Sequence, residues 1–195
     1  MRILWGFLLA VSKSLVRWVQ QQWWRGRFSA SGAKIARGVI IEKDSECLLS
    51  IGRGSAVGVG TLLIVKSEFG LTGSLRIGEH TAVNEYNNLR AAGGEINIGN
   101  HCQIAQFCTL VATNHTTETS KFMIDAPWDG AKTSINVEDD VWIGANCVIL
   151  PGVRIGRGAV IGAGSVITRD IPSHSIFAGV PAKFIRRRTL FASEP

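Results

Sequence analysis

The sequence predicts an all-β protein, a parallel β-helix in which short strands wind into stacked coils. Large aliphatic residues recur at every sixth position in the second half of the chain, at Val137, Ile143, Ile149, Ile155, Ile161 and Ile167. Five of these aliphatic residues have a small or β-branched residue two positions before them, and three are directly followed by a glycine. A six-residue repeat is typical of parallel β-helices, whereas a helix needs apolar residues three and four positions apart.

Each repeat unit is expected to form a short strand and then a sharp turn, so that three units complete one coil of a prism. Successive coils then pair as parallel sheet and stack their aliphatic side chains in register. With 46% hydrophobic residues the chain can bury a sizeable core, and its 22 glycines suit many tight turns. We therefore expect one β-helix domain at residues 31–171, with an appended segment at each end.

Residues 1–30 are predicted to form an amphipathic helix, with four of the six tryptophans, five basic residues and no acidic one. The apolar run 3–11 is shorter than the roughly 20 residues that cross a bilayer. One face gathers Trp5, Phe7, Leu8, Val11, Leu15, Trp18 and Val19, beside Lys13 and Arg17. This pattern favours peripheral contact with a membrane through residues 1–28. The alternative is a helix packed on the prism or on a neighbouring subunit.

The six-residue phase begins faintly at Ile35 and restarts several times, which predicts five to six coils. The offsets between restarts require insertions, such as 67–74, to bulge out at corners. The longest interruption, 116–134, is predicted to be an extruded loop, and long loops on rigid scaffolds often carry function. The segment 172–195 is expected to cap the last coil and to contain a short basic helix.

The net charge of +6 is concentrated at the two ends of the chain, because nine basic residues lie within 1–30 and 183–188. This favours local anionic partners over a nucleic-acid-binding surface. The four cysteines form no CxxC pair, and three of them occupy the small inward position of the repeat: Cys102, Cys108 and Cys147. We interpret all four as reduced core residues. Reduced cysteines suit a cytoplasmic protein. If its N-terminal helix binds lipid, we expect the protein to be peripheral on the inner face of the cytoplasmic membrane.

His115 is a candidate catalytic residue from its position alone. It ends the segment LVATNH, where a coil meets the extruded loop, so it can be held rigidly and yet be covered by a flexible segment. An imidazole at such a place can act as a general base toward a hydroxyl group. The alternative is a turn histidine that is hydrogen-bonded to the backbone.

Three segments resemble the hexapeptide-repeat acyltransferases, in the branch of the maltose, galactoside and polysaccharide O-acetyltransferases. They are TNH followed by a loop, VWIGANCVILPGVRIGRGAVIGAGSVITRDIP, and AGVPAKFIRRR, and the resemblance covers about residues 75–188. It implies a left-handed parallel β-helix, a homotrimer with active sites between adjacent subunits, and acetyl-CoA as acyl donor. His115 then matches the catalytic histidine, which deprotonates the acceptor hydroxyl.

The same resemblance implies a set of contacts to acetyl-CoA. Backbone N–H groups near Gly144 and Ala145 match the oxyanion contact. Trp142 matches a wall of the pantetheine channel, and its packing against the long loop is the alternative. Ala163 matches an amide contact to the pantetheine arm, and Thr168 matches a polar contact to the nucleotide end.

Basic residues near the C-terminus match positions that meet the CoA phosphates. These are Lys183 and Arg186, although the galactoside enzymes carry Arg where this chain has Lys183. Arg187 and Arg188 either share that contact or are solvated.

For the acceptor, the resemblance points to an asparagine within VNEYNN, and the alignment leaves Asn84, Glu85 and Asn87 as candidates. Asn114 either orients His115 or turns the chain. No metal is expected, because the γ-class carbonic anhydrases of similar fold use an HxxxxH pair, a spacing that the other histidines do not provide: His80, His101 and His174.

The sequence therefore predicts an acetyl-CoA-dependent O-acetyltransferase that acts on a sugar hydroxyl, of a surface polysaccharide or a lipid-linked oligosaccharide. One alternative is the same chemistry on a soluble acceptor, such as a free sugar, serine, a nucleotide-sugar amine or an antibiotic. The other is a solenoid scaffold without enzymatic activity.

Overall fold

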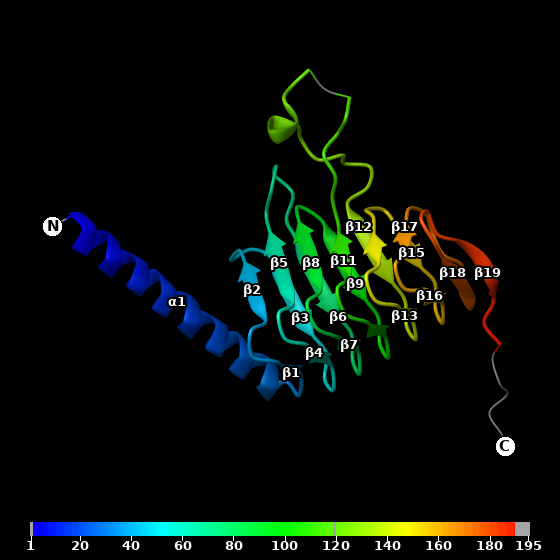
Figure 1. Cartoon of the computed structure of the whole chain (residues 1–195), viewed down its shortest axis with the longest axis horizontal. Coiled ribbons are helices and arrows are strands. Elements are labelled where there is room, and N and C mark those ends of the chain that lie inside the picture. The colour runs from blue at the N-terminus through cyan, green and yellow to red at the C-terminus, as the bar shows by residue number, and fades with distance from the viewer. Residues whose placement is uncertain (1, 119, 190–195) are drawn as a thin grey trace.

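A computed structural model describes residues 2–118 and 120–189, with side chains from residue 14 onward. Helix α1 (Arg2–Ala30) crosses one end of a solenoid of stacked coils, and the hairpin of β18 (Ser175–Ala178) and β19 (Lys183–Arg187) closes the other end (Figure 1). The strands between them pair in parallel, coil upon coil. This architecture confirms the predicted parallel β-helix and is consistent with the left-handed winding that the resemblance implies.

The strands form three faces of a prism. Face A contains, in order along the prism, β1 (Lys34–Ile35), β4 (Ala56–Val57), β7 (Ala82–Val83), β10 (Gln103–Ile104), β13 (Trp142–Ile143), β16 (Val160–Ile161), β18 and β19. Face B contains β2 (Ile40–Lys43), β5 (Leu62–Lys66), β8 (Asn88–Ala92), β11 (Thr109–Val111), β14 (Val148–Ile149) and β17 (Val166–Ile167). Face C contains β3 (Leu48–Ile51), β6 (Ser74–Ile77), β9 (Glu95–Ile98), β12 (Ser134–Val137) and β15 (Arg154–Ile155). Six strands on face B mark six coils, within the predicted number.

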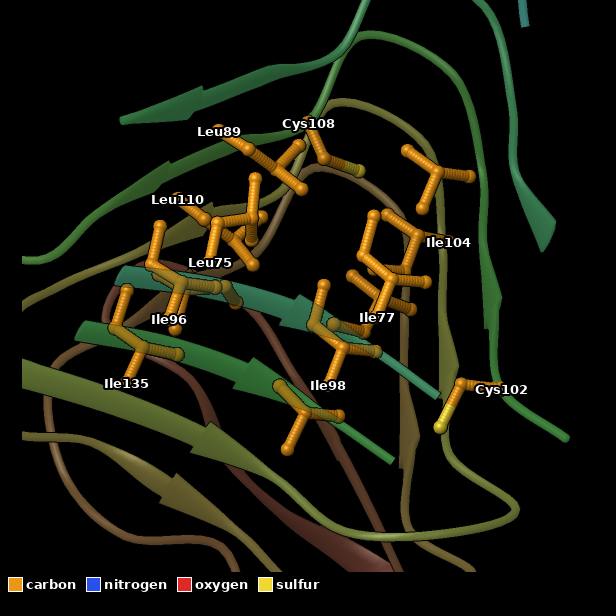
Figure 2. Packing of buried hydrophobic residues seen from close by; sticks show 14 of the residues in the cluster. Leu75, Ile77, Leu89, Ile96, Ile98, Cys102, Ile104, Cys108, Leu110 and Ile135 are labelled. Carbon is orange, nitrogen blue, oxygen red and sulfur yellow. The ribbon is translucent and has the colours of Figure 1, made fainter. Parts of the chain in front are cut away.

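The core consists of aliphatic side chains stacked in columns along the prism. On face A, Val83, Ile104, Ile143 and Ile161 are register partners on successive strands, and all are buried. Figure 2 shows columns of this core, with labels on Leu75, Ile77, Leu89, Ile96, Ile98, Ile104, Leu110 and Ile135. All six aliphatic residues of the repeat from 137 to 167 are buried, as are the small residues two positions before. The predicted inward positions are confirmed.

Helix α1 closes the N-terminal end of this core. The rings of Trp24 and Phe28 stack with centroids 5.6 Å apart and are buried. The Gln21 amide donates to the Ile41 carbonyl and accepts from the Ile41 N–H, both at 3.0 Å. The predicted helix is confirmed, and its C-terminal half packs on the prism. Four residues of the predicted apolar face lie outside the described side chains, Trp5, Phe7, Leu8 and Val11, and so does the basic residue Lys13 beside that face.

Within the described chain, no helix combines the length and the hydropathy that crossing a bilayer requires.

The C-terminal cap is a strand, and the short helix predicted within 172–195 is wrong. Strand β19 pairs antiparallel with β18, and Phe184 packs edge-on against Phe177 with centroids 5.6 Å apart. Without β19, the outer edge of β18 would expose unpaired N–H and C=O groups, which an added strand satisfies. A helix this short is marginal alone, so the open sheet edge decides the conformation. Residues 190–195 lie outside the described chain.

All four cysteines are free and buried, as predicted. Burial raises the pKa of the Cys102 thiol above its ordinary value. Contact with the Cys147 thiol, together with burial, raises the pKa of Cys108, and the Cys108 S–H donates to the Gly144 carbonyl at 3.1 Å. Cys102 and Cys108 are therefore protonated thiols, and together with Cys147 they fill the small inward position of the repeat.

Truncation of a core side chain in a middle coil should destabilise the solenoid. Ile104 is fully buried, so Ile104→Ala leaves a cavity and should lower the free energy of unfolding by about 2–5 kcal/mol. Leu48→Ala is the matched control, because Leu48 is 44% exposed on face C, and it should cost less than about 1 kcal/mol. Urea unfolding followed by circular dichroism measures both, and equal losses would contradict the assigned inward register.

Candidate functional site

The extruded loop leaves the solenoid between β11 and β12 and projects beyond the coils (Figure 1). Its two ends run antiparallel at the base, and we call residues 114–116 and 127–129 the neck. The Thr116 N–H donates to the Pro127 carbonyl at 2.9 Å, and the Asp129 N–H donates to the Asn114 carbonyl at 2.7 Å. Between these bonds, His115 forms a β-bridge with Trp128. The neck therefore fixes the His115 backbone at the junction of coil and loop, where the sequence places it.

The His115 ring is oriented by the backbone of its own loop. Its Nδ1 lies 2.5 Å from the carbonyl oxygen of Ala126, a residue that is fully buried. A carbonyl oxygen only accepts hydrogen bonds, so Nδ1 carries the proton and donates it. In the neutral imidazole, Nε2 then has the free lone pair and can accept a proton from a ligand. This carbonyl was not identified from the sequence, which offers no signal for it.

Two aromatic rings surround His115. Trp128 packs on it at an angle of 46° with centroids 4.1 Å apart, and Phe69 meets it edge-on at 5.9 Å. Phe69 lies in the predicted corner bulge between β5 and β6, two coils away from the loop. The coil between this bulge and the loop turns at Gly93, between β8 and β9. A Cβ on Gly93 would lie 2.6 Å from the Trp128 Nε1. The absence of a side chain at Gly93 therefore lets Trp128 lie over the intervening coil, where Phe69 packs against it at 5.2 Å.

Phe69 and Trp128 were missed in the sequence analysis. Each is an aromatic residue among polar, glycine and proline neighbours in a segment without repeat phase, in SEFGL and APWDG. An aromatic residue in an extruded segment needs a packing partner, and that is the signal that could have found them.

Trp142 lies in a second group, on the outer side of face A. It is 52% exposed, so the alternative in which the long loop covers it within one chain is wrong. Its register partner is Val160 on β16, whose partner is Ile176 on β18, which pairs with Arg186 on β19. Trp142 and Arg186 are thus connected by one row of outward positions across four strands.

The corner between faces A and B contains Gly144, Ala145 and Ala163. The Gly144 N–H donates to the Ile161 carbonyl at 2.9 Å, so this amide belongs to the sheet and is not open to an oxyanion as predicted. The Ala145 N–H has no hydrogen-bond partner within the described residues. A Cβ on Gly144 would lie 2.6 Å from the Ala163 backbone nitrogen, so Gly144 permits close stacking of the two coils. Thr168 is exposed and follows β17, at the far end of face B.

The C-terminal basic residues divide into two classes. Lys183 pairs with Ala178, the last residue of β18, which places it beside the corner of faces A and B. Its side chain is exposed. Arg186 is exposed on the same strand. Arg188 is committed to the fold: its guanidinium donates to the Asp140 carboxylate at 2.8 Å and to the Gly158 carbonyl at 3.1 Å. Arg187 donates to the Ser173 carbonyl at 3.0 Å.

The acceptor candidates occupy different environments. Asn87 is 1% exposed; its amide donates to the Asn84 carbonyl at 2.9 Å and accepts from the Cys108 N–H at 2.7 Å. It stabilises a corner and has no surface to offer a ligand, so the prediction for Asn87 is wrong. Asn84 is half-buried and Glu85 exposed at that corner, and Asn114 is exposed on the neck.

The two groups do not meet within one chain. His115 lies at the corner between faces B and C, whereas Trp142, Ala145 and Ala163 lie on face A and its corner with face B. A site that uses both groups needs a second copy of the chain, with the neck of one copy beside face A of the other.

Comparisons with known proteins agree with the architecture. Residues 134–169 match the family described as bacterial transferase hexapeptide (six repeats). A hexapeptide-repeat-containing acetyltransferase from Vibrio cholerae O1 biovar eltor, solved in complex with acetyl coenzyme A, superposes with a TM-score of 0.58 at 31% identity, over 73% of this chain and 71% of that chain. The polySia-specific acetyltransferase NeuO superposes with a TM-score of 0.51 at 28% identity, over 83% of this chain and 79% of its own.

A relative identified by sequence matches a shorter region. The 2,3,4,5-tetrahydropyridine-2,6-dicarboxylate N-acetyltransferase of Staphylococcus aureus (strain JH9) is 55% identical over 51 residues, which are 26% of this chain and 21% of that protein. The chain thus spans about a fifth of the length of this curated relative.

The Ala126 contact predicts the tautomer of His115. In protein labelled with ¹⁵N-histidine at a pH where imidazoles are neutral, His115 should show a protonated Nδ1 and an unprotonated Nε2, because only Nδ1–H can donate to the carbonyl. Free imidazole side chains in water favour the other tautomer, which provides the reference. The His115→Asn variant assigns the resonance, and an unprotonated Nδ1 would contradict the arrangement.

Proposed function

We propose that this chain, which belongs to the hexapeptide-repeat acetyltransferases, transfers the acetyl group of acetyl-CoA to a hydroxyl group of a saccharide. Membership of the family rests on the 31% identity shared with the Vibrio cholerae acetyltransferase over most of both chains. The observation that carries the proposal is the geometry of His115, in which the Ala126 carbonyl holds the Nδ1 proton and leaves Nε2 open. That is the state that a general base requires.

In the proposed reaction the acceptor hydroxyl oxygen attacks the thioester carbonyl carbon while Nε2 of His115 takes the hydroxyl proton. The resulting oxyanion accepts a hydrogen bond from the Ala145 N–H, which has no partner within the described chain. The C–S bond then breaks, and the sulfur of CoA takes the proton from the imidazolium. His115 returns to its neutral form, so the base is regenerated in each turnover.

Acetyl-CoA is proposed to lie along face A and its corner with face B. The exposed indole of Trp142 would form one wall for the pantetheine arm, and the small residue Ala163 permits close approach to the backbone. Lys183 and Arg186, exposed at the end of the same face, would pair with the phosphates through charge-assisted contacts. Since His115 lies at another corner of its own chain, the reaction would take place between two copies, and we propose the homotrimer that the resemblance implies.

The acceptor is proposed to be a saccharide of a surface polysaccharide or of a lipid-linked precursor. The similarity to the polySia-specific acetyltransferase NeuO supports this choice. The Staphylococcus aureus relative is an N-acetyltransferase, and an oriented imidazole can deprotonate an amine as well as a hydroxyl. Parallel assays with hydroxyl and amino sugars of the same ring therefore decide between O- and N-transfer.

Substitution of His115 should remove the chemistry but not the binding of the donor. His115→Asn should lower kcat by about two to four orders of magnitude with little change in KM for acetyl-CoA, because only proton transfer is lost. Release of the CoA thiol in the presence of saccharide acceptors measures the rate.

His101→Asn is the matched control, because His101 stacks on His80 at a corner without contact to the neck, and it should retain full activity. Undiminished turnover by His115→Asn would remove the general-base assignment. A wild-type protein that releases no thiol with any hydroxyl or amino acceptor would favour the scaffold alternative.

Trp142→Ala should produce the opposite kinetic pattern. If the indole is a wall of the donor channel, its removal should raise KM for acetyl-CoA by about tenfold, equivalent to about 1.4 kcal/mol of ground-state binding, with a small change in kcat. Initial rates at varied acetyl-CoA concentration measure this. An unchanged KM would move the donor site away from face A.

A further inference from the structure

Helix α1 has a second apolar face, which points away from the solenoid. Trp24, Phe28 and Gln21 contact the first coil, as described above. On the opposite side lie four apolar residues that are each more than half exposed: Leu15, Val16, Val19 and Trp23. We call these four the outer stripe. They line one shallow apolar hollow together with Gln20.

The outer stripe is not explained by the packing of the protein. Leu15, Val19 and Trp23 are spaced by four residues, which places them on one side of a helix. A helix that only covers its own core carries one apolar stripe, directed at that core, and polar residues opposite. A contiguous exposed apolar face on a soluble domain usually marks an interaction surface.

The charge around the outer stripe identifies the kind of partner. Residues 1–30 contain five basic residues and no acidic one. The Arg27 guanidinium lies 5.5 Å from the centre of the Trp23 ring, so a cation stands directly at the edge of the stripe. Arg17 is exposed on the side of the helix that faces the first coil, where it lines a hollow with Glu42 and Lys66. An apolar face with tryptophan and flanking basic residues is the composition of helices that lie in the head-group region of anionic membranes.

The position of the helix allows this contact. In Figure 1, α1 runs obliquely across the end of the solenoid, and its N-terminal part leads away from the coils. The stripe faces outward from that end, so a flat surface can meet it without displacing Trp24 and Phe28 from the core. The coils, the neck and face A would then project from the surface.

We propose that α1 binds the surface of an anionic lipid bilayer through the outer stripe and its basic neighbours, as a peripheral contact. The apolar side chains enter the head-group boundary, and Arg27, at the edge of the stripe, pairs with a lipid phosphate. This inference does not depend on acetyl transfer, because its test requires no substrate.

Flotation of the full-length protein with vesicles tests the proposal. Vesicles of phosphatidylcholine and phosphatidylglycerol should carry the protein upward in a density gradient at low salt, whereas pure phosphatidylcholine vesicles should carry much less. The double variant Leu15→Gln/Val19→Gln should reduce the bound fraction at limiting lipid by about tenfold or more, because two side chains lose their burial.

The loop tip provides a matched control. Phe122 and Ile124 are more than four-fifths exposed, so Phe122→Gln/Ile124→Gln removes similar apolar surface elsewhere in the protein. This variant should float like the wild type. Circular dichroism establishes that each variant is folded.

Three outcomes would overturn the proposal. In the first, the wild type is absent from the floated fraction at low salt. In the second, the loop variant loses binding while the stripe variant retains it. In the third, sedimentation velocity shows that the wild type is an oligomer that does not float and that the stripe substitutions dissociate it. The last result would assign the stripe to a contact between copies of this chain.

Discussion

The stacking of one inward aliphatic side chain on its counterpart in the next coil is the constraint on which the rest of the structure depends. Parallel strands of neighbouring coils are held about 4.8 Å apart by their hydrogen bonds, so every coil must fill the same inward positions. Ile104 on Ile143 and Ile143 on Ile161 are examples. Extra residues cannot enter such a column, and the solenoid must expel them at corners.

This expulsion assembles the candidate site. The bulge after β5 and the long loop after β11 both emerge at the corner between faces B and C, separated by the coil whose corner is Gly93. Phe69 and Trp128 meet across that coil and enclose His115, while the Ala126 carbonyl sets its tautomer. A rigid repeat thus provides the reference frame, and its interruptions provide the chemistry.

The ends of the solenoid obey a different constraint, because the stacking stops there and leaves apolar surface and unpaired backbone groups. At the C-terminal end, β19 pairs with the open edge of β18. At the N-terminal end, Trp24 and Phe28 of α1 cover the first coil. The outward face of α1 is then free of any role in the core, which is why its apolar composition calls for a separate explanation.

Local pattern alone predicted much of this protein. The period of six determined the β-helix, its inward positions, the burial of the cysteines and the junction at which His115 stands, because each depends on residues close together in the chain. Contacts between coils lie beyond such a pattern. The pairing of Phe69 with Trp128 depends on the register of coils two apart, and the burial of Asn87 depends on which side of a corner it occupies. Strand β19 replaced the expected helix because a sheet edge formed by residues elsewhere was unpaired, and the Gly144 amide was taken by Ile161 of the next coil. Only the tertiary structure decided these points, since each is a contact between segments that the sequence separates and the stacking brings together.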